Sequence, residues 1–334
     1  MLRSLLALSV VFALPFSVPA QAPKELRVGI IGCDTSHAGV YTSIFNGPKA
    51  AGDPDFSGFK VVAVFPGGSP DLPISANRVE KFTASLRDKH GLEVVDSIDK
   101  LLPKVDVVLL LSVDGRVHWK QAEPVLKAGK RVFIDKPFTA SLSDALRIAQ
   151  LSQQTKTPLF SSSSLRFSKA LTELKNDPKI GPVIGCMTYG PCSYTEHHPD
   201  LAFYGIHGLE LLYSLMGKGC ESVTRTTTKD CDTLTGVWAD GRVATYRGLR
   251  SGKNEFGATV FCKNAIVTSL PSEGYEPVAR EMARFFRTGT APVSMEEMVE
   301  IIAVLEAADL SKARNGAPVT IAEVMNNAKA KLAP

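Results

Sequence analysis

The chain has 334 residues, of which 22% are charged and 44% are hydrophobic. This balance excludes a disordered, collagen-like or coiled-coil chain, and the length is typical of two domains. The formal net charge of +4 is too small over this length to indicate a nucleic-acid-binding surface, and the six cysteines have no spacing typical of a zinc site or a disulfide scaffold.

Residues 1–22 have the pattern of a secretory signal peptide. Arg3 gives a basic start, residues 5–16 form an apolar run, and small residues around Ala20 and Ala22 provide cleavage positions. The alternative is an uncleaved membrane anchor, but the apolar run is shorter than the roughly 20 residues that span a bilayer. We therefore expect a secreted or periplasmic mature protein without stable membrane insertion, in which a disulfide between Cys186 and Cys192 is permitted but not established.

Residues 23–140 predict an α/β domain of the Rossmann type, with a doubly wound parallel sheet. Apolar runs that end in turn residues predict buried strands at 26–32, 59–65, 105–111 and 131–134. Helical patterns lie between them at 36–46, 75–90, 96–102 and 117–128. Strands that alternate with helices in this way favour a parallel sheet covered on both faces.

Residues 141–334 predict a second α/β domain with a large, mostly antiparallel open sheet. After a helix at 141–153, strands are expected at 183–190, 221–228, 233–240, 243–250, 257–263 and 264–270. Asp240-Gly241 is a good hairpin turn, and residues 295–308 predict an amphipathic helix. One face of such a sheet is free for binding or for self-association into a homo-oligomer.

The first predicted strand leads into Gly32-Cys33-Asp34-Thr35-Ser36-His37. A dinucleotide fingerprint has glycine at the first, third and sixth positions of such a turn, because the backbone must approach a diphosphate at the start of the helix. Only Gly32 fits, because Asp34 and His37 stand at the other two positions. By itself this segment also fits an ordinary strand-to-helix turn capped by Asp34 or Ser36.

Residues 105–140 carry a more specific pattern. His118 opens a predicted helix, an Ala-Gly-Lys turn follows at 128–130, and the next strand ends in Asp135-Lys136-Pro137. Further matches are Arg166-Phe167, residues 180–184 and residues 207–212. Together they resemble the Gfo/Idh/MocA family of nicotinamide-dependent oxidoreductases over nearly the whole mature chain. The resemblance implies a Rossmann domain followed by an α/β domain with a large open sheet.

The resemblance also implies roles for individual residues. Lys136 and His207 would be the catalytic acid/base residues. A cofactor, NAD or NADP, would contact Gly32, Asp34, Ser36, His37, Ser112, His118, Asp135 and Lys136. The position of Lys136 has independent support, because a residue that follows a parallel strand lies at the carboxyl edge of the sheet, where doubly wound folds bind ligands. The alternatives are a surface lysine paired with Asp135 and a helix-capping histidine at position 207.

Three positions depart from the family pattern. Asp34 brings a carboxylate to a turn that should approach a diphosphate, and the two repel each other unless the side chain turns away or is neutralised. Pro66 ends the second strand, where many members have an acidic residue for the ribose. Phe203 stands where an aspartate often precedes the helical histidine, so either Tyr204 or Asp200 is expected to partner His207.

Residues 189–200 form an unusual segment in which His197 and His198 lie close to carboxylates. It predicts a loop over the substrate, a metal site or a solvated polar loop; we favour substrate contact and assign no metal ligands. Substrate contacts are therefore expected from Arg166, His197, His198 and Tyr204, whose aromatic ring suits stacking on a sugar.

These features lead to three hypotheses for the function. The first is an exported oxidoreductase that transfers a hydride between a tightly held nicotinamide cofactor and a sugar or cyclic polyol. The second is an enzyme that cleaves glycosidic bonds by transient oxidation with the same cofactor. The third is a carbohydrate-binding protein of the same fold that has lost the cofactor and catalysis.

Overall fold

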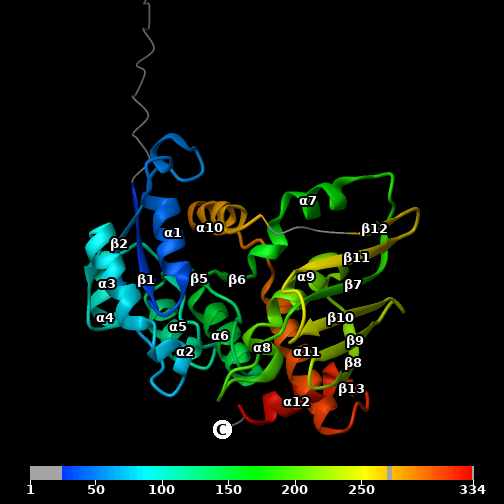
Figure 1. The fold of residues 1–334 in the computed structure, drawn as a ribbon. Helices are drawn as coiled ribbons and strands as arrows, with labels where there is room; N and C mark the ends of the chain where they lie inside the picture. The colour runs from blue at the N-terminus through cyan, green and yellow to red at the C-terminus, as the bar shows by residue number, and fades with distance from the viewer. Residues whose placement is uncertain (1–24, 269–272, 333–334) are drawn as a thin grey trace, which may run out of the picture.

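The computed structural model describes residues 25–268 and 273–332, so the predicted signal peptide lies outside the described residues. The chain forms two sheets side by side, each with its own helices (Figure 1). No described helix is long and apolar enough to cross a membrane. The six cysteines are all free thiols, Cys186 and Cys192 included.

The first sheet has six parallel strands in the order β3-β2-β1-β4-β5-β6. The strands are β1 (Leu26–Ile31), β2 (Phe59–Phe65), β3 (Glu93–Val94), β4 (Val107–Leu110), β5 (Val132–Ile134) and β6 (Leu159–Ser161). The helices are α1 (Ser36–Asn46), α2 (Pro73–Ala76), α3 (Val79–His90), α4 (Ile98–Leu101), α5 (His118–Lys127) and α6 (Leu142–Thr155), with short 3₁₀ turns at Ala50–Gly52 and Leu102–Lys104. This order confirms the doubly wound Rossmann class, and the strand order reverses between β1 and β4.

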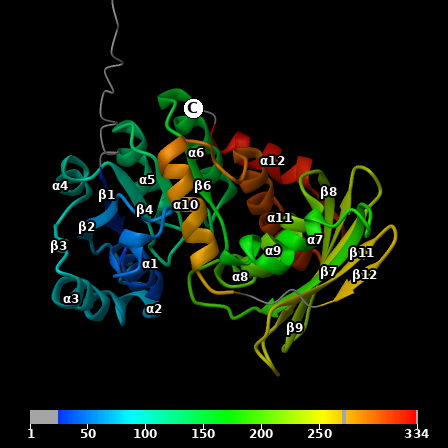
Figure 2. The ribbon, with the colours of Figure 1, turned by 90° about the horizontal axis from the view of Figure 1, so that it is seen from above.

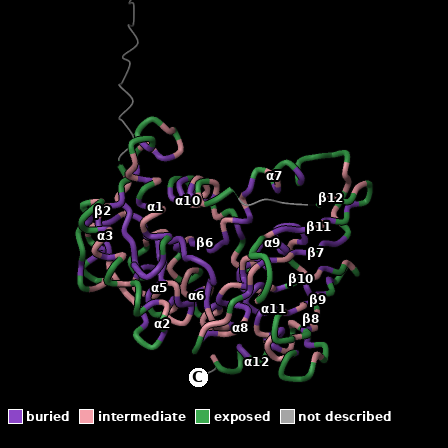
Figure 3. The backbone as a smooth tube through the Cα atoms, viewed as in Figure 1, coloured by how far each residue is buried: buried purple, intermediate pink, exposed green. Residues whose placement is uncertain are grey.

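The first sheet runs further along the chain than residue 140, where we expected the first domain to end. Helix α6 crosses over to β6, which pairs in parallel with β5. The prediction missed β6 because its three residues are too short to give a strand pattern. The central strands β4 and β5 are buried along their whole length, which explains their continuous apolar sequences. Figure 3 shows buried residues mainly in the interior of the molecule and exposed residues in its outer loops.

The second sheet has seven strands in the order β12-β11-β7-β10-β9-β8-β13. The strands are β7 (Val183–Pro191), β8 (Cys220–Thr227), β9 (Cys231–Trp238), β10 (Val243–Leu249), β11 (Gly257–Cys262), β12 (Ile266–Thr268) and β13 (Val319–Thr320). Only the β7–β10 pair is parallel, and the predicted turn at Asp240-Gly241 joins β9 to β10. The expected large, mostly antiparallel sheet is therefore confirmed.

Helices cover one face of the second sheet (Figure 2). They include α9 (Ile206–Met216), α11 (Met295–Ala313) and α12 (Ile321–Ala330). A 3₁₀ turn at Ser164–Phe167 and the short helix α7 (Lys169–Asn176) connect β6 to β7, and the short helix α8 (Asp200–Phe203) lies between β7 and α9. The opposite face of the sheet carries exposed apolar side chains, among them Val237, Val243 and Phe261.

Helix α10 (Glu276–Thr288) follows the second sheet in the chain but packs against the first (Figure 2). Phe285 makes an edge contact with Phe160 of β6, with 5.0 Å between the ring centroids. Arg280 forms ion pairs with Asp53 at 2.8 Å and Asp55 at 2.6 Å. The chain therefore returns to its first half before it ends in α11 and α12.

Candidate active site

The carboxyl edge of β5 places Lys136 in a buried aromatic setting between the two domains. The side chain is 8% exposed, and its Nζ lies 5.9 Å and 5.3 Å from the ring centroids of Phe203 and Tyr204. Nζ also donates a long hydrogen bond of 3.4 Å to the carbonyl oxygen of Phe203. Phe203 therefore takes part in the site through its backbone and its ring, although it cannot act as a carboxylate.

His207 lies in the first turn of α9, and its ring centroid is 5.1 Å from that of Tyr204. Its Nδ1 is 2.7 Å from the hydroxyl of Ser163, which follows β6. Within the described residues Nε2 has no hydrogen-bond partner. The Ser163 oxygen already accepts a bond from the backbone N–H of Leu165. A hydroxyl oxygen can accept two bonds, so this contact fits either ring tautomer; when the Ser163 hydroxyl donates to Nδ1, the neutral ring carries its own proton on Nε2.

Burial and neighbouring charges shift the pKa of both Lys136 and His207. Burial, with the charge of Lys136 as the second cause, lowers the pKa of His207 well below the ordinary 6.5. Burial also lowers the pKa of Lys136, which the neighbouring Asp135 carboxylate opposes. The site therefore holds a neutral imidazole beside an amine whose proton is easier to remove than that of a surface lysine.

His37 and Asp135 form a second polar unit at the same edge. Nδ1 of His37 is 2.5 Å from a carboxylate oxygen of Asp135, and Nε2 is 3.1 Å from the hydroxyl of Tyr275. Burial alone would raise the pKa of Asp135, but His37 and Lys136 outweigh it and hold the pKa below the ordinary range. The ring of His37 is therefore held between the Asp135 carboxylate and the Tyr275 hydroxyl.

The first turn keeps one glycine of the fingerprint for a steric reason. Gly32 has φ +94°, and a Cβ at this position would lie 2.2 Å from the backbone nitrogen of Ser112. The tight approach of β1 to the end of β4 therefore requires glycine here. Thr35 caps α1 by accepting the N–H of His37.

Asp34 turns inward from this turn and is completely buried. Its carboxylate accepts hydrogen bonds from the Ser75 hydroxyl at 2.6 Å and from the Val113 N–H at 2.9 Å. Burial raises the pKa of Asp34, and these two bonds oppose the rise. Neither Asp34 nor Ser36 caps α1, contrary to the capping alternative.

Ser75 and Val113 belong to the two loops that follow β2 and β4, and further contacts join these loops directly. Arg116 makes a two-fold hydrogen bond with Asp71, at 2.8 Å and 3.0 Å, and pairs with Asp114 at 2.8 Å. The Ser75 oxygen also accepts the N–H of Ser69. The loops on either side of the first turn therefore meet across it.

Ser36, Ser112 and His118 were also expected to contact a cofactor, and each has a different environment. Ser36 is exposed at the start of α1. The Ser112 hydroxyl donates to Gln121 at 2.8 Å. His118 is fully buried, and its two ring nitrogens lie 3.1 Å and 2.8 Å from the carbonyl oxygens of Phe138 and Ser112. Ser112 and His118 therefore hold the end of β4 in place.

The predicted substrate contacts divide into two groups. Tyr204 and His198 lie near Lys136, and His198 is buried with an Nε2 that has no hydrogen-bond partner in the described chain. His197 is exposed. Arg166 is buried in an ion-paired group with Glu210 and Glu297, so it stabilises the packing of α9 against α11 and is not free for a substrate.

The segment before α8 is anchored by a buried arginine. Arg225 of β8 pairs with Asp200, Asp232 and Asp309, and donates to the hydroxyl of Tyr194 at 2.7 Å. Asp200 is therefore engaged away from His207, whose actual partner is Ser163. The run of serines after β6 was the available signal for this, because it too follows a parallel strand. In the described ranges no group of three or more His, Cys, Asp or Glu residues is placed to hold a metal ion.

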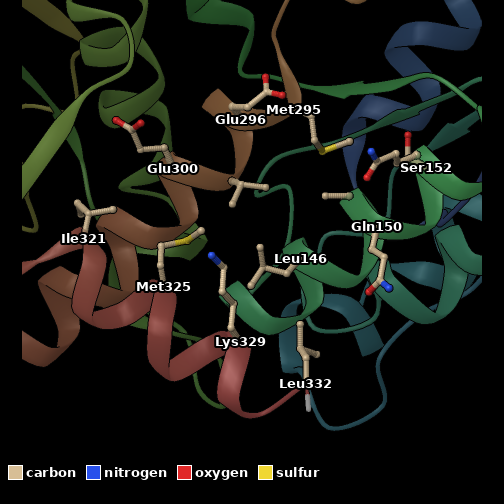
Figure 4. A pocket seen from close by; sticks show the side chains of 13 residues that line it. Leu146, Gln150, Ser152, Met295, Glu296, Glu300, Ile321, Met325, Lys329 and Leu332 are labelled. Carbon is tan, nitrogen blue, oxygen red and sulfur yellow. The ribbon is translucent and has the colours of Figure 1, made fainter. Parts of the chain in front are cut away.

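A groove of about 960 Å³ lies elsewhere, between α6, α11 and α12 (Figure 4). Its lining is mainly apolar, with Leu146, Val299, Ile321 and Met325 among its residues. None of the residues that line it was predicted to bind cofactor or substrate, so the site at Lys136 rests on its chemistry and its position in the fold.

Comparison with known proteins identifies the class. Residues 26–163 match the model of an oxidoreductase family with an NAD-binding Rossmann fold, Gfo/Idh/MocA. An uncharacterized protein of Saccharomyces cerevisiae is 25% identical over 287 residues, which cover 77% of each chain. Residues 26–163 therefore match the Gfo/Idh/MocA family, which confirms the resemblance that the sequence motifs predicted.

Solved structures of similar fold include two inositol dehydrogenases. A putative myo-inositol dehydrogenase from Sinorhizobium meliloti matches with a TM-score of 0.73 and 18% identity, over 89% of this chain and 99% of that one. Scyllo-inositol dehydrogenase from Lactobacillus casei, with bound NAD(H) and scyllo-inositol, matches with a TM-score of 0.73 and 14% identity, over 90% of this chain and 100% of that one. The family and these structures support a nicotinamide cofactor, without distinguishing NAD from NADP.

The described residues at the first turn do not fit the diphosphate of such a cofactor. The side chains of Asp34 and His37 stand where the fingerprint has glycine, and the flanking loops are joined across the turn. The edge of β5, in contrast to the first turn, offers a charged group that could meet a ligand. Among the described residues Lys136 forms no ion pair with a carboxylate. The fold is thus that of an NAD-binding domain, whereas the turn itself departs from it.

Proposed function

We propose that this protein is an exported oxidoreductase that acts on a sugar or cyclic polyol at the carboxyl edge of β5. The observation that carries the proposal is the pairing of a buried, unpaired Lys136 with a neutral His207. Such a pair suits a substrate hydroxyl, because one group exchanges the proton and the other holds the oxygen.

The proton step follows from the protonation of the two residues. A substrate hydroxyl placed between them gives its proton to the free amine of Lys136, which burial makes accessible. Nε2–H of His207 donates a hydrogen bond to the oxygen and stabilises its developing negative charge. In the reverse direction the Lys136 ammonium returns the proton to the oxygen. When the Ser163 hydroxyl donates to Nδ1, it fixes the His207 tautomer that this requires.

Three features support a polyhydroxylated substrate. The rings of Phe203, Tyr204 and Phe256 surround Lys136 and His207, and such rings pack against the apolar face of a sugar or cyclic polyol. His198 supplies an unpaired polar atom nearby. Structures of similar fold include proteins described as inositol dehydrogenases. Secretion or periplasmic location rests on the signal-peptide pattern of residues 1–22.

The closed first turn favours one other candidate, a carbohydrate-binding protein that has lost the cofactor. The inward Asp34 and the joined loops are the observation behind it. The glycoside-cleaving alternative needs the same nicotinamide chemistry as the first proposal, so a failure to bind the cofactor would exclude both.

The test combines cofactor and substrate. The purified mature protein is examined by mass spectrometry for released NAD or NADP, and a panel of cyclic polyols and sugars is assayed for absorbance change at 340 nm. We expect turnover with at least one polyol when NAD or NADP is added at millimolar concentration, and a loss of at least about a hundredfold in Lys136→Met, the range that general acid–base groups contribute. Cofactor affinity should remain, because this change leaves the first turn intact.

Lys130→Met is the matched control, because Lys130 lies at the opposite end of β5 and donates to the carbonyl of Val105. Full turnover in Lys136→Met would exclude the proposed role of Lys136. If calorimetry shows that the protein binds a polyol but neither contains nor binds a nicotinamide cofactor, the oxidoreductase is excluded and the carbohydrate-binding protein is supported.

We also propose that the free face of the second sheet joins two copies of the chain. Val237, Val243, Gly185, Phe261 and Ile266 are directly opposite one another on neighbouring strands and form one row across five strands. The four apolar side chains in this row are 36% to 67% exposed. A continuous apolar row on a sheet face is typical of an interface.

A further inference from the structure

The first turn contains a negative charge supplied by the chain itself. In a dinucleotide-binding fold this turn receives a diphosphate, and the second glycine of the fingerprint allows its approach. Here Asp34 stands at that position, and its carboxylate is fully buried inside the turn. An anion therefore already lies in the turn, although residues 26–163 match a family with an NAD-binding fold.

The contacts of Asp34 resemble those of a bound anion. One carboxylate oxygen accepts the backbone N–H of Val113, which follows β4, and the other accepts the hydroxyl of Ser75 in α2. No cation forms an ion pair with Asp34 among the described residues. The carboxylate is thus held by neutral donors from both sides of the turn, as phosphate groups are in such folds.

These contacts also close the approach. Ser75 lies on the loop after β2 and Val113 on the loop after β4, which flank the path of a dinucleotide in a doubly wound fold. Asp34 ties both loops to the turn, and the Arg116–Asp71 pair joins them a second time. His37 anchors the start of α1 to Asp135 at the next strand end. Each side chain that replaces a fingerprint glycine therefore has a specific partner across the edge.

We infer that Asp34 is a resident anion that takes the place of the diphosphate, and that it determines whether the chain accepts a nicotinamide dinucleotide. A dinucleotide binds only when the carboxylate leaves the turn and the two loops separate. This inference rests on the proposed function, because it concerns the cofactor of the same site. It makes Asp34 a specificity-determining residue for the cofactor rather than a catalytic one.

The experiment titrates the mature protein and its Asp34→Gly variant with NAD and NADP by calorimetry. Glycine restores the second fingerprint position and removes both the charge and the tie between the loops. We expect a Kd above about 1 mM for the native chain and at least about tenfold tighter binding in the variant. Asp106→Gly is the matched control, because Asp106 pairs with Arg27 at the opposite edge of the sheet and should leave the affinity unchanged.

A second variant tests the same inference if Asp34→Gly does not fold. Ser75→Ala combined with Asp71→Ala removes one contact of the carboxylate and the Arg116 pair, and leaves Asp34 in place; it should also tighten binding. Micromolar binding by the native chain would overturn the inference and leave the proposed oxidoreductase intact. Absence of binding in the native chain and in every folded variant would overturn both the inference and the redox function.

Discussion

His198 is a residue whose burial has a measurable consequence for stability. Burial lowers its pKa from 6.5 to about 4. Between these pH values the unfolded chain binds a proton that the folded chain does not, so the folded state loses stability as the pH falls through this window. The loss contributed by this residue approaches about 3 kcal/mol near pH 4, because each pKa unit corresponds to about 1.4 kcal/mol.

We therefore predict that His198→Asn reduces the dependence of the free energy of unfolding on pH between 7 and 4.5. Urea denaturation at both pH values measures this dependence. His197→Asn is the control, since His197 is exposed one position earlier and should leave the dependence unchanged. If the free energy of unfolding depends equally on pH in the native chain and in His198→Asn, the lowered pKa of His198 is contradicted.

Ser163 contacts the ring of His207 as well as the backbone of Leu165. Its hydroxyl faces Nδ1, so Ser163→Ala removes the group that, as a donor to Nδ1, fixes the proton on Nε2. We predict that nitrogen NMR of the ¹⁵N-labelled native protein shows one dominant His207 tautomer and that the variant shows a mixture. An unchanged tautomer in the variant would mean that another group orients the ring.

For individual residues, the sequence identified those that belong to motifs but not their hydrogen-bond partners. Lys136 was predicted to lie at the strand edge, and it does so because the position follows from strand order alone. Tyr275 was not found, because it lies 238 residues from His37 and only the packing of α10 brings the two together. The inward turn of Asp34 was likewise beyond the sequence, since it depends on Ser75 and Val113 from two other loops.

Among the elements, the segment from β7 to α8 depends on a single buried arginine. Arg225 is fully buried and compensates the carboxylates of Asp200, Asp232 and Asp309. The sequence predicted this segment as a loop over the substrate, but nothing in it pointed to an anchor on β8. The anchored loop places α8, and with it Phe203, beside Lys136.

We predict that Arg225→Met lowers the free energy of unfolding by about 3 kcal/mol, because it removes the buried cation that joins three carboxylates. Asp232 keeps its pair with Arg250 and Asp200 keeps its pair with Lys312, so the loss falls mainly on Asp309 and on the hydrogen bonds of the guanidinium. Arg242→Met, on the hairpin between β9 and β10, should cost less than about 1 kcal/mol because its pair with Asp240 is largely exposed. Chemical denaturation of both variants measures the difference. Similar values for the two would show that the Arg225 group is not a stabilising anchor.

For the whole molecule, the sequence predicted both sheets and their order along the chain. Strand and helix periodicity was sufficient for this, although it missed the short strands β3, β6 and β13 and the helices α7, α10 and α12. The arrangement of the free sheet face was only partly foreseen. Its apolar row arises from strand register, which brings together residues from five separate strands.

We predict that the native chain is a dimer in size-exclusion chromatography with light scattering and that Val243→Asp with Phe261→Asp makes it a monomer. Both side chains are exposed on the free face, so the fold should remain. A stable interface buries roughly 800 Å² per partner. Val94→Asp is the control, because Val94 is exposed on β3 of the other sheet. A native monomer would exclude the interface.

The path of α10 determines how the two halves can be separated. A protein cut once between the sheets would lose α10 from its first half, and the rings of Phe59 and Phe160 would lose Phe286 and Phe285 as neighbours. The acidic pair Asp53 and Asp55 would also lose Arg280. The nucleotide-type half is therefore completed by α10, and newly made chain can finish folding this half only after Glu276–Thr288 has been synthesised, after the central strands of both halves.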